Sequence, residues 1–479
     1  MKIKSVINIL GALLIFLSLS LLACLYIAIF FEEKIFYWII SVILPLVFGA
    51  IFYKTTSVPE DINTKEGFAI VTLGWVFLSL FGALPFFISN TLPNFIDAFF
   101  ETMSGFTTTG ATVIQDIEKL PKSLLFWRSL THWYGGMGII VLSLALFPLM
   151  KKIGGMQLFK AEVPGISNER LVPKIATTAK YLWTVYLLLS LLEILFLYFG
   201  GMSLFESFCH TFGTMATGGF STKNGSIGYY NSIYIETVIT IFMFLAGVNF
   251  SLHYQLLKGD IKSYFKDKEF IFYTSLIFSA IALITLVNLS YYGSLSESFR
   301  FSSFQVISIT TTTGYCTADF DKWPVFCKLL LVVLMFVGGC AGSTGGGMKN
   351  IRVMILLKKS FQEIKKIIYP QAVFPLRFGT QVIPPDTATT VLAFFILYMF
   401  IFVICSLLMS FLGLDLITAV SSVVATLGNI GPGLVKVGAS QTYAHLPYMG
   451  KIILSFCMLV GRLEIYTVLV LFLPLTWKN

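Results

Sequence analysis

Residues 97–112 read DAFFETMSGFTTTGAT, and this stretch recurs in altered form three more times along the chain. The related stretches are ESFCHTFGTMATGGFST at 206–222, FSSFQVISITTTTGYCT at 301–317 and DLITAVSSVVATLGNIGPG at 415–433. Each starts with an amphipathic segment of about ten residues, too short to cross a bilayer. Each ends in a run of threonine and glycine, which are poor helix formers. Four such copies indicate that the chain is built from internal repeats.

One glycine in each copy gives the alignment: Gly110, Gly219, Gly314 and Gly428. In three copies an acid lies 13 residues before that glycine, and the third copy has Phe301 at this place. The three acids are Asp97, Glu206 and Asp415. A carboxylate suits the positive end of the helix dipole, so we expect these acids to cap the short helices.

The segments between the copies are long and apolar. The chain of 479 residues is 56% hydrophobic and 12% charged, against about 25% charged residues in soluble domains. Stretches of about 20 apolar residues can cross a hydrocarbon core of roughly 30 Å. Such stretches lie at 7–31, 35–53, 67–89, 123–149, 177–200, 232–257, 269–290, 324–348, 384–412 and 448–473. We therefore predict an all-α integral membrane protein whose first span is a retained helix rather than a cleaved signal.

The repeats predict a simple division of the chain. We expect two N-terminal transmembrane helices in 1–58, followed by four units of helix, re-entrant loop and helix at 59–160, 161–262, 263–370 and 371–479. Backbone without helical hydrogen bonds is tolerated at membrane depth only where it lines water or is buried in protein. The four loops should therefore meet around one pseudo-symmetric axis.

The chemistry of these loops suits a cation. Rings of backbone carbonyls can replace the hydration shell of an ion, and the absence of fixed charge in the ring favours a monovalent ion. A single threonine–glycine run could be an ordinary loop end, but four at matched positions favour a pore. The candidate ion ligands are Thr108, Thr109, Gly110, Thr217, Gly218, Gly219, Thr312, Thr313, Gly314, Leu427, Gly428 and Asn429.

The net charge of +9 reflects topology rather than nucleic-acid binding. Lysine and arginine gather in three loops between spans, at 151–180, 258–268 and 349–377. By the positive-inside rule these loops and the N-terminus face the cytoplasm, which places all four threonine–glycine runs outside. The seven scattered cysteines form no CxxC pair and predict packing residues rather than a metal site.

The threonine–glycine motifs resemble those of the TrkH/TrkG/KtrB family of bacterial potassium uptake proteins. The motifs are TTTGAT at 107–112, ATGGFST at 216–222, TTTGYCT at 311–317, ATLGNIGPG at 425–433, GGCAGSTGGGMKNIR at 338–352 and GRLEIYT at 461–467. The two extra spans before residue 54 are similar to those of the TrkH branch. Family members with serine in place of the first filter glycine tend to accept sodium, so Gly110 favours potassium.

The resemblance implies channel-like potassium uptake across the bacterial inner membrane, with one filter strand from each repeat. It implies no covalently bound cofactor, with K⁺ as the transported ion and the filter as its only metal site. It also implies a homodimer and a peripheral, cytoplasmic, nucleotide-binding subunit of the TrkA type. The longest inner loop, near 349–383, is too short to fold into such a domain itself.

A glycine-rich run interrupts the last span of the third repeat. Residues 338–347 read GGCAGSTGGG, and Met348 stands where a phosphate-binding loop would need lysine. This run is either a flexible linker at the membrane edge or a mobile loop beneath the filter, and the resemblance supports the second interpretation. The predicted gate residues are Gly338, Gly339, Gly342, Gly345, Gly346 and Gly347.

Arg462 lies inside the last predicted span. A charge at that depth costs at least about 2.5–3.5 kcal/mol, so it should face the pore or a partner. It could be a snorkelling or structurally paired arginine, but the resemblance implies an electrostatic barrier below the filter. We predict that Arg462 repels cations until the glycine-rich loop moves.

Two other function classes fit the sequence less well. A secondary transporter would be built from inverted repeats, whereas these four repeats share one orientation, although symport with H⁺ or Na⁺ stays open. No nucleophile elbow, metal triad or nucleotide motif predicts an enzyme. Five polar residues lie in or near spans, where they form interhelical hydrogen bonds or a proton relay: Arg128, His132, Glu193, Glu236 and His253.

Overall fold

The computed structural model describes residues 2–56, 63–150, 175–378 and 381–477. In that part of the chain, six helices are long and apolar enough to cross a membrane, and two sharply bent helix pairs bring the number to eight if each pair is one span. The described residues hold one short antiparallel pair of strands, β1 (Arg377–Phe378) and β2 (Gln381–Val382). The prediction of an all-α integral membrane protein is confirmed.

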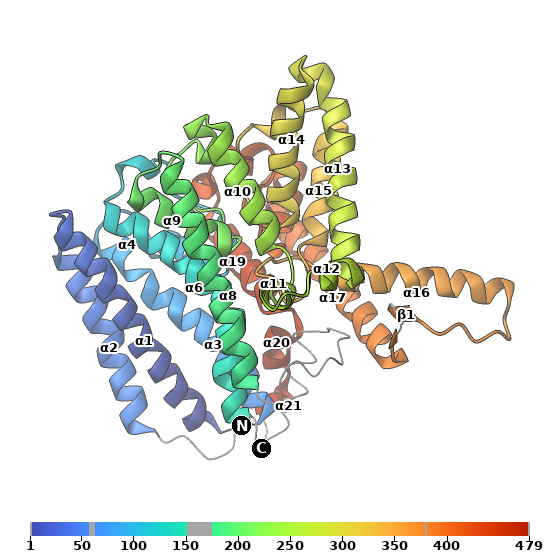
Figure 1. Cartoon of the computed structure of the whole chain (residues 1–479). Helices are drawn as coiled ribbons and strands as arrows, with labels where there is room; N and C mark the ends of the chain where they lie inside the picture. Colours follow the sequence, from blue (N-terminus) through green and yellow to red (C-terminus); the bar gives the residue numbers. More distant parts are fainter. Residues whose placement is uncertain (1, 57–62, 151–174, 379–380, 478–479) are drawn as a thin grey trace.

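Two N-terminal helices, α1 (Ile3–Phe30) and α2 (Phe36–Thr55), form a hairpin at one edge of the molecule (Figure 1). They approach closely where glycines face each other, since a Cβ on Gly11 would lie 2.8 Å from the carbonyl oxygen of Gly49. Small residues allow such backbone contact between membrane helices, where dispersion replaces the hydrophobic effect as the driving force. Polar contacts add to this packing, since Asn8 Nδ2 donates to Tyr53 O at 2.9 Å and Ser18 Oγ donates to Val42 O at 2.8 Å.

The first two repeats follow in chain order. The first holds α3 (Thr64–Gly82), α4 (Leu84–Ile88), the short helix α5 (Phe95–Phe106) and α6 (Lys122–Met150). The second holds α8 (Ile175–Phe199), the short helix α9 (Leu204–Met215), α10 (Ile233–Ala246) and α11 (Phe250–Leu257). In both, one long helix leads to a helix of 12 residues and then, after an extended segment, to a second long or broken helix.

The last two repeats keep this order. The third holds α12 (Lys262–Lys266), α13 (Lys268–Tyr292), α14 (Leu295–Thr310), α15 (Val325–Val337) and α16 (Asn350–Ile368), which projects from the side of the molecule (Figure 1). The fourth holds α17 (Pro385–Phe411), α18 (Leu416–Leu427), α19 (Tyr448–Arg462), α20 (Tyr466–Leu469) and α21 (Pro474–Trp477). Single 3₁₀ turns lie at Ile117–Lys119, Ser226–Tyr230, Phe320–Lys322, Val435–Val437, Tyr443–His445 and Val470–Phe472.

Three predicted spans are broken in the structure. The span at 232–257 bends by 101° between α10 and α11, and the span at 448–473 bends by 114° between α19 and α20. The span at 324–348 ends as a helix at Val337. The expectation of continuous helices was wrong in the first two places, whereas the end at Val337 agrees with the interruption predicted from the glycine-rich run that starts at Gly338. At the first break Asn249 caps the new helix, and at the second Glu464 has a positive φ of 55° that no helix continues through.

The short helices begin at polar caps, but not all of these are the predicted acids. Asp415 does cap α18, and the Thr418 N–H at 3.1 Å lowers the pKa of its carboxyl group. In α5 and α9 the caps are Asn94 and Ser203, because the acids lie three residues inside the helix. The capping prediction was therefore wrong for Asp97, which pairs with a lysine instead, and Glu206 only supports its cap.

Two predicted repeat boundaries, at 58/59 and 160/161, lie outside the described residues, as do the basic residues of 151–174. The predicted boundary at 262/263 falls inside the short helix α12, and the one at 370/371 falls in the connection between α16 and α17.

Candidate ion pathway

Each short helix ends in the same backbone turn. In α5 the N–H of Thr108 donates to Gly105 O at 3.0 Å and that of Thr109 to Ser104 O at 2.9 Å. The same pair of bonds ends the other three short helices, with Gly218 donating to Gly213 O, Thr313 to Ser308 O and Ile430 to Ala425 O. This pattern is a Schellman cap, which needs one residue in the left-handed region just after the helix.

The left-handed residues are threonine in three repeats and asparagine in the fourth. Their φ angles are 53° at Thr108, 52° at Thr217, 62° at Thr312 and 54° at Asn429. A β-branched residue rarely adopts this conformation, whereas asparagine tolerates it. Strained backbone of this kind persists only where surrounding structure enforces it, and it gathers at functional sites.

The alignment of the fourth copy at Gly428 was wrong by three residues. Gly428 has φ of −80° and closes α18, as Thr107 closes α5. The glycine that shares the positive φ of Gly110, Gly219 and Gly314 is Gly431, at 98°. Leu427 and Gly428 thus lie at the helix end. Ile430 and Gly431 occupy the ring positions that the sequence alignment had given to Leu427 and Gly428. The sequence holds a signal for this register, because Asn429 is the residue suited to the left-handed turn.

The extended segments that follow the caps are called here the four central strands: 108–112, 217–221, 312–316 and 429–433. Each strand lies directly against the next. A Cβ on Gly110 would lie 2.1 Å from Gly218 O, and one on Gly219 would lie 2.0 Å from Thr313 O. A Cβ on Gly314 would lie 1.9 Å from Ile430 O, and one on Gly431 would lie 2.6 Å from Thr109 O in the first strand. The four central strands therefore form a closed ring, and every glycine is required by the carbonyl beside it.

The predicted threonines of the ring are buried, whereas Gly110, Gly219 and Gly314 are partly exposed. Thr108, Thr109, Thr217, Thr312 and Thr313 are each at most 1% exposed. Hydroxyl groups join neighbouring positions, since Thr107 Oγ1 lies 2.8 Å from Thr109 Oγ1 and Thr311 Oγ1 lies 2.8 Å from Thr313 Oγ1. The arrangement brings uncharged carbonyl and hydroxyl oxygens together from all four repeats, which is the donor set that suits a dehydrated alkali cation.

The glycine-rich run, with the two residues after it, forms what we call the glycine loop (338–349). It lies against the N-terminal ends of the central strands, where the short helices end. The Gly346 N–H donates to Thr312 Oγ1 at 2.7 Å, and Thr344 Oγ1 donates to Met215 O at 3.0 Å. A Cβ on Gly346 would lie 2.5 Å from Gly428 O. The predicted loop residues Gly338, Gly339, Gly342, Gly345, Gly346 and Gly347 thus run from the end of α15 to this contact.

Arg462 reaches the glycine loop from the last residue of α19. Its Nη1 donates to Thr344 O at 2.7 Å and its Nη2 to Gly135 O at 2.9 Å, and the residue is 2% exposed. Both partners are carbonyls, so no carboxylate is bonded to the guanidinium in the described part of the chain. Arg462 therefore ties the loop to α6 with a positive charge close to the central strands.

The five polar residues noted in the spans pack mainly as interhelical contacts. Arg128 pairs with Glu101, and Glu236 pairs with Arg300 at 2.6 Å. His253 contacts Tyr264 Oη at 2.6 Å, while His132 stacks on Phe220 with ring centroids 4.1 Å apart. Glu193 is fully buried. These residues do not form one connected chain, which a proton relay would need.

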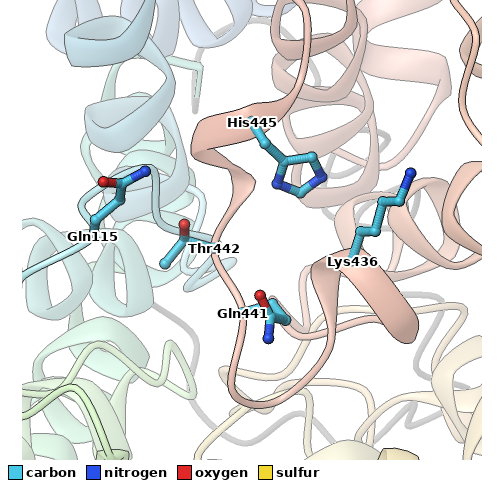
Figure 2. A pocket seen from close by; sticks show the side chains of 5 residues that line it. All are labelled: Gln115, Lys436, Gln441, Thr442 and His445. Atoms are coloured by element: carbon cyan, nitrogen blue, oxygen red, sulfur yellow. The ribbon is translucent and has the colours of Figure 1, made fainter.

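A hollow of about 440 Å³ lies beside the residues that follow the C-terminal ends, here called the exits, of the first and fourth central strands (Figure 2). It is lined by Gln115, Lys436, Gln441, Thr442 and His445. The two exits are joined here, because the Tyr443 N–H donates to Thr112 O at 2.8 Å and Tyr443 Oη donates to Gly431 O at 2.7 Å. No pattern in the sequence marks these residues as functional, since they lie in loops without a repeated motif.

A family model described as a cation transport protein, TrkH, matches residues 33–477. The Trk system potassium uptake protein TrkH of Escherichia coli K12 is 43% identical over 425 residues, which cover 88% of this chain and 87% of that protein. TrkH of Vibrio parahaemolyticus is 39% identical over 490 residues and TrkG of E. coli K12 is 35% identical over 484 residues. Both matches cover 100% of this chain. They cover 100% of TrkH from Vibrio parahaemolyticus and 99% of TrkG.

The fold is similar to a solved structure as well. The crystal structure of the potassium transporter TrkH from Vibrio parahaemolyticus matches with a TM-score of 0.90 at 37% identity, and the match covers 100% of both chains. The resemblance found in the sequence motifs is therefore confirmed along the whole chain.

Proposed function

Because this chain belongs to the TrkH family of cation transport proteins, we propose that it takes up potassium through one pore at the centre of its four repeats. Its relatives are named as potassium uptake proteins and not as enzymes. The transported ion is K⁺, which passes along the axis of the four central strands. The chain is a transporter, and its chemistry is the exchange of water for protein oxygens around the ion.

The observation that carries the proposal is the closed ring of central strands. Thr109, Gly218, Thr313 and Ile430 each place a carbonyl oxygen against the glycine of the preceding repeat. Oxygens held at one level by backbone contacts can replace the hydration shell without a fixed charge. The ion ligands in the fourth repeat are then Asn429 and Ile430 rather than Leu427, since α18 ends at Leu427.

Two elements control the pathway in this proposal. The glycine loop closes it, because Gly346 and Thr344 bond directly to the segments around the central strands. Arg462 holds the loop and repels cations, because its charge meets only carbonyl partners at Thr344 and Gly135. Opening requires that the loop move away from Thr312 and that the Arg462 bond to Thr344 break.

The relatives are named as parts of a Trk system, and we infer that this chain works with a peripheral, nucleotide-binding subunit on its cytoplasmic side and as a homodimer. The basic loops support an orientation with the N-terminus in the cytoplasm of a bacterial inner membrane. In that orientation the central strands open to the outside and the glycine loop lies on the cytoplasmic side of them.

Reconstitution tests the proposal. Liposomes containing the purified chain are loaded with one ion and the fluxes of K⁺, Rb⁺ and Na⁺ are compared, with and without the soluble subunit. The proposal expects K⁺ and Rb⁺ to exceed Na⁺, and the soluble subunit with its nucleotide to change the rate. Equal flux of the three ions, or none with the subunit present, would contradict it.

A further inference from the structure

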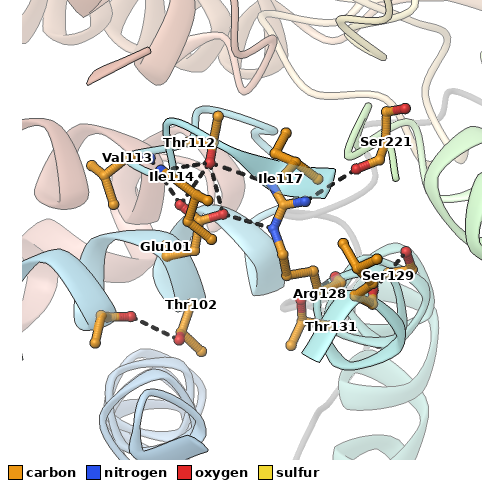
Figure 3. Close-up of polar contacts among 12 residues, drawn as sticks. Glu101, Thr102, Thr112, Val113, Ile114, Ile117, Arg128, Ser129, Thr131 and Ser221 are labelled. Atoms are coloured by element: carbon orange, nitrogen blue, oxygen red, sulfur yellow. Dashed lines mark hydrogen bonds and ion pairs between the residues drawn. The ribbon is translucent and has the colours of Figure 1, made fainter. Parts of the chain in front are cut away.

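A buried ion pair lies directly behind the first two central strands (Figure 3). Arg128 on α6 donates from Nε to Glu101 Oε1 on α5 at 2.9 Å, and the two residues are 2% and 1% exposed. Nothing in the repeat pattern or in the motifs singled out Glu101. Its position, one turn before the end of the short helix, places the pair beside the ring.

Glu101 holds the first central strand just past its glycine. The carboxylate accepts from the Val113 N–H at 2.9 Å and from Thr112 Oγ1 at 2.9 and 3.0 Å. Figure 3 shows the carboxylate between these two groups and the guanidinium. The exit of the first strand is therefore tied to its own short helix by a charged acceptor, which makes stronger hydrogen bonds than a neutral one.

Arg128 extends the connection to the second central strand. Its Nη1 donates to Ser221 O at 3.1 Å, its Nη2 contacts Thr112 Oγ1 at 3.3 Å, and its guanidinium carbon lies 4.1 Å from the centre of the Phe220 ring. Thr112 and Ser221 each lie two residues past the glycine of their strand. One planar guanidinium thus spans the exits of two neighbouring strands, a task that the fixed fork of arginine can perform and lysine cannot.

The other repeats tie their strands with neutral groups, at the position that matches Glu101 in the second and third repeats and one residue before it in the fourth. His210 Nε2 contacts Ser221 Oγ at 3.1 Å, and Ser421 Oγ accepts from the Leu434 N–H at 3.1 Å. Gln305, with its amide turned to satisfy both neighbours, accepts from the Thr317 N–H at 2.8 Å. Each short helix therefore holds the exit of its own strand, and only the first adds an ion pair that reaches the next strand.

A buried ion pair needs an explanation beyond stability. Removing two charges from water is costly, and an apolar pair of similar volume is often at least as stable. Buried charges that persist can instead fix one arrangement among several. Here the arrangement that they fix is the spacing between the first and second central strands.

We propose that the Glu101–Arg128 pair is a positioning element that sets the discrimination between potassium and sodium, by holding the first two central strands at a fixed separation. This inference rests on the proposed potassium pathway. Na⁺ is smaller than K⁺, so oxygens that can move inward solvate it better. A ring whose strands are tied at their exits cannot make that movement, and releasing Thr112 and Ser221 should admit sodium.

The test compares potassium and sodium flux in liposomes that contain the full-length chain. Glu101→Gln keeps the side-chain shape and removes the charge, and Thr112→Val removes the hydroxyl that links the pair to the strand. Both variants are expected to lower the K⁺/Na⁺ flux ratio by about tenfold, the scale of effect seen when groups that orient metal ligands are removed. The K⁺/Na⁺ flux ratio of Arg128→Lys should lie between the ratios of these two variants and that of the wild type.

The matched control is Glu236→Gln, which removes another buried carboxylate from an ion pair, with the partly exposed Arg300 at 2.6 Å, without contact to a central strand. This variant should keep the wild-type flux ratio even if its thermal stability falls. A merely structural role for Glu101 would change stability in both variants and the flux ratio in neither.

The outcomes separate the two claims. A selective wild type with unchanged ratios in Glu101→Gln and Thr112→Val overturns the positioning role and leaves the pathway standing. A wild type without potassium flux overturns the proposed function and this inference with it. Should Glu101→Gln fail to fold, Thr112→Val decides alone, because it leaves the ion pair intact.

Discussion

The side-chain amide of Asn429 donates to the hydroxyl oxygen of Thr109 at 3.0 Å, although the two residues are 320 positions apart in the sequence. The same nitrogen donates to Met458 O on α19 at 2.9 Å. Asn429 therefore closes the ring between the fourth and first central strands and anchors it to the helix behind. It also occupies the left-handed turn, so its backbone and its side chain have separate roles.

Replacing Asn429 separates these two roles. Asn429→Ala loses both side-chain bonds and places alanine in the left-handed region, which costs about 1–2 kcal/mol. Asn429→Gly loses the bonds but accepts the conformation. We expect potassium flux to fall strongly in the alanine variant and less in the glycine variant. Equal flux in both, at the wild-type level, would show that neither role matters.

The register of the fourth strand is tested at Gly431. A Cβ there would lie 2.6 Å from Thr109 O, so Gly431→Ala should lower potassium flux by about tenfold or more, as displaced ion ligands do. Gly201→Ala is the control, because Gly201 has a similar φ of 92° but nothing within 4 Å of an added Cβ. If both variants lose flux equally, backbone strain rather than contact with the ring is responsible.

Removing the charge below the ring should open the pathway. Arg462→Gln breaks the bonds to Thr344 O and Gly135 O and removes the barrier to cations. We expect basal potassium flux without the soluble subunit to rise at least about fivefold, which corresponds to about 1 kcal/mol of barrier. Arg300→Gln, which removes an arginine away from the glycine loop, should leave basal flux unchanged. Unchanged flux in Arg462→Gln would count against the gating role.

A second ion pair fixes α5 to α19. Lys451 Nζ lies 2.6 Å from Asp97 Oδ1, and the lysine side chain is 2% exposed. Asp97→Asn leaves the ammonium buried without its carboxylate, so the free energy of unfolding should fall by about 1–3 kcal/mol. Thermal unfolding in detergent measures this loss. Adding Lys451→Met should recover part of it, and a double variant less stable than Asp97→Asn would exclude the pairing as the cause.

The sequence predicted the fold class because each element left a strong local signal. Apolar runs marked the spans, and the repeated threonine–glycine runs marked the places where the chain turns back. The breaks at 247–249 and 463–465 were missed, since the residues there are largely apolar and read as part of a span. Hydropathy measures composition and does not register a bend.

The candidate site was predicted in three repeats and misaligned in the fourth. Gly428 matches the other glycines when the letters before it are compared, as TLG with TTG. The structure shows that the helix length and the left-handed residue decide the register, and these place Gly431 beside Thr109 O. Glu101 was missed for a related reason, because its partner Arg128 lies on another helix and no sequence pattern links the two.

The most direct measurement is the position of the ion itself. Crystals grown with Rb⁺ or Tl⁺ in place of K⁺ would reveal the heavy cation by anomalous scattering. The account predicts a peak on the axis of the ring, within bonding distance of the carbonyl oxygens of Thr109, Gly218, Thr313 and Ile430. A peak elsewhere, with none inside the ring, would contradict the claim that these four strands bind the transported ion.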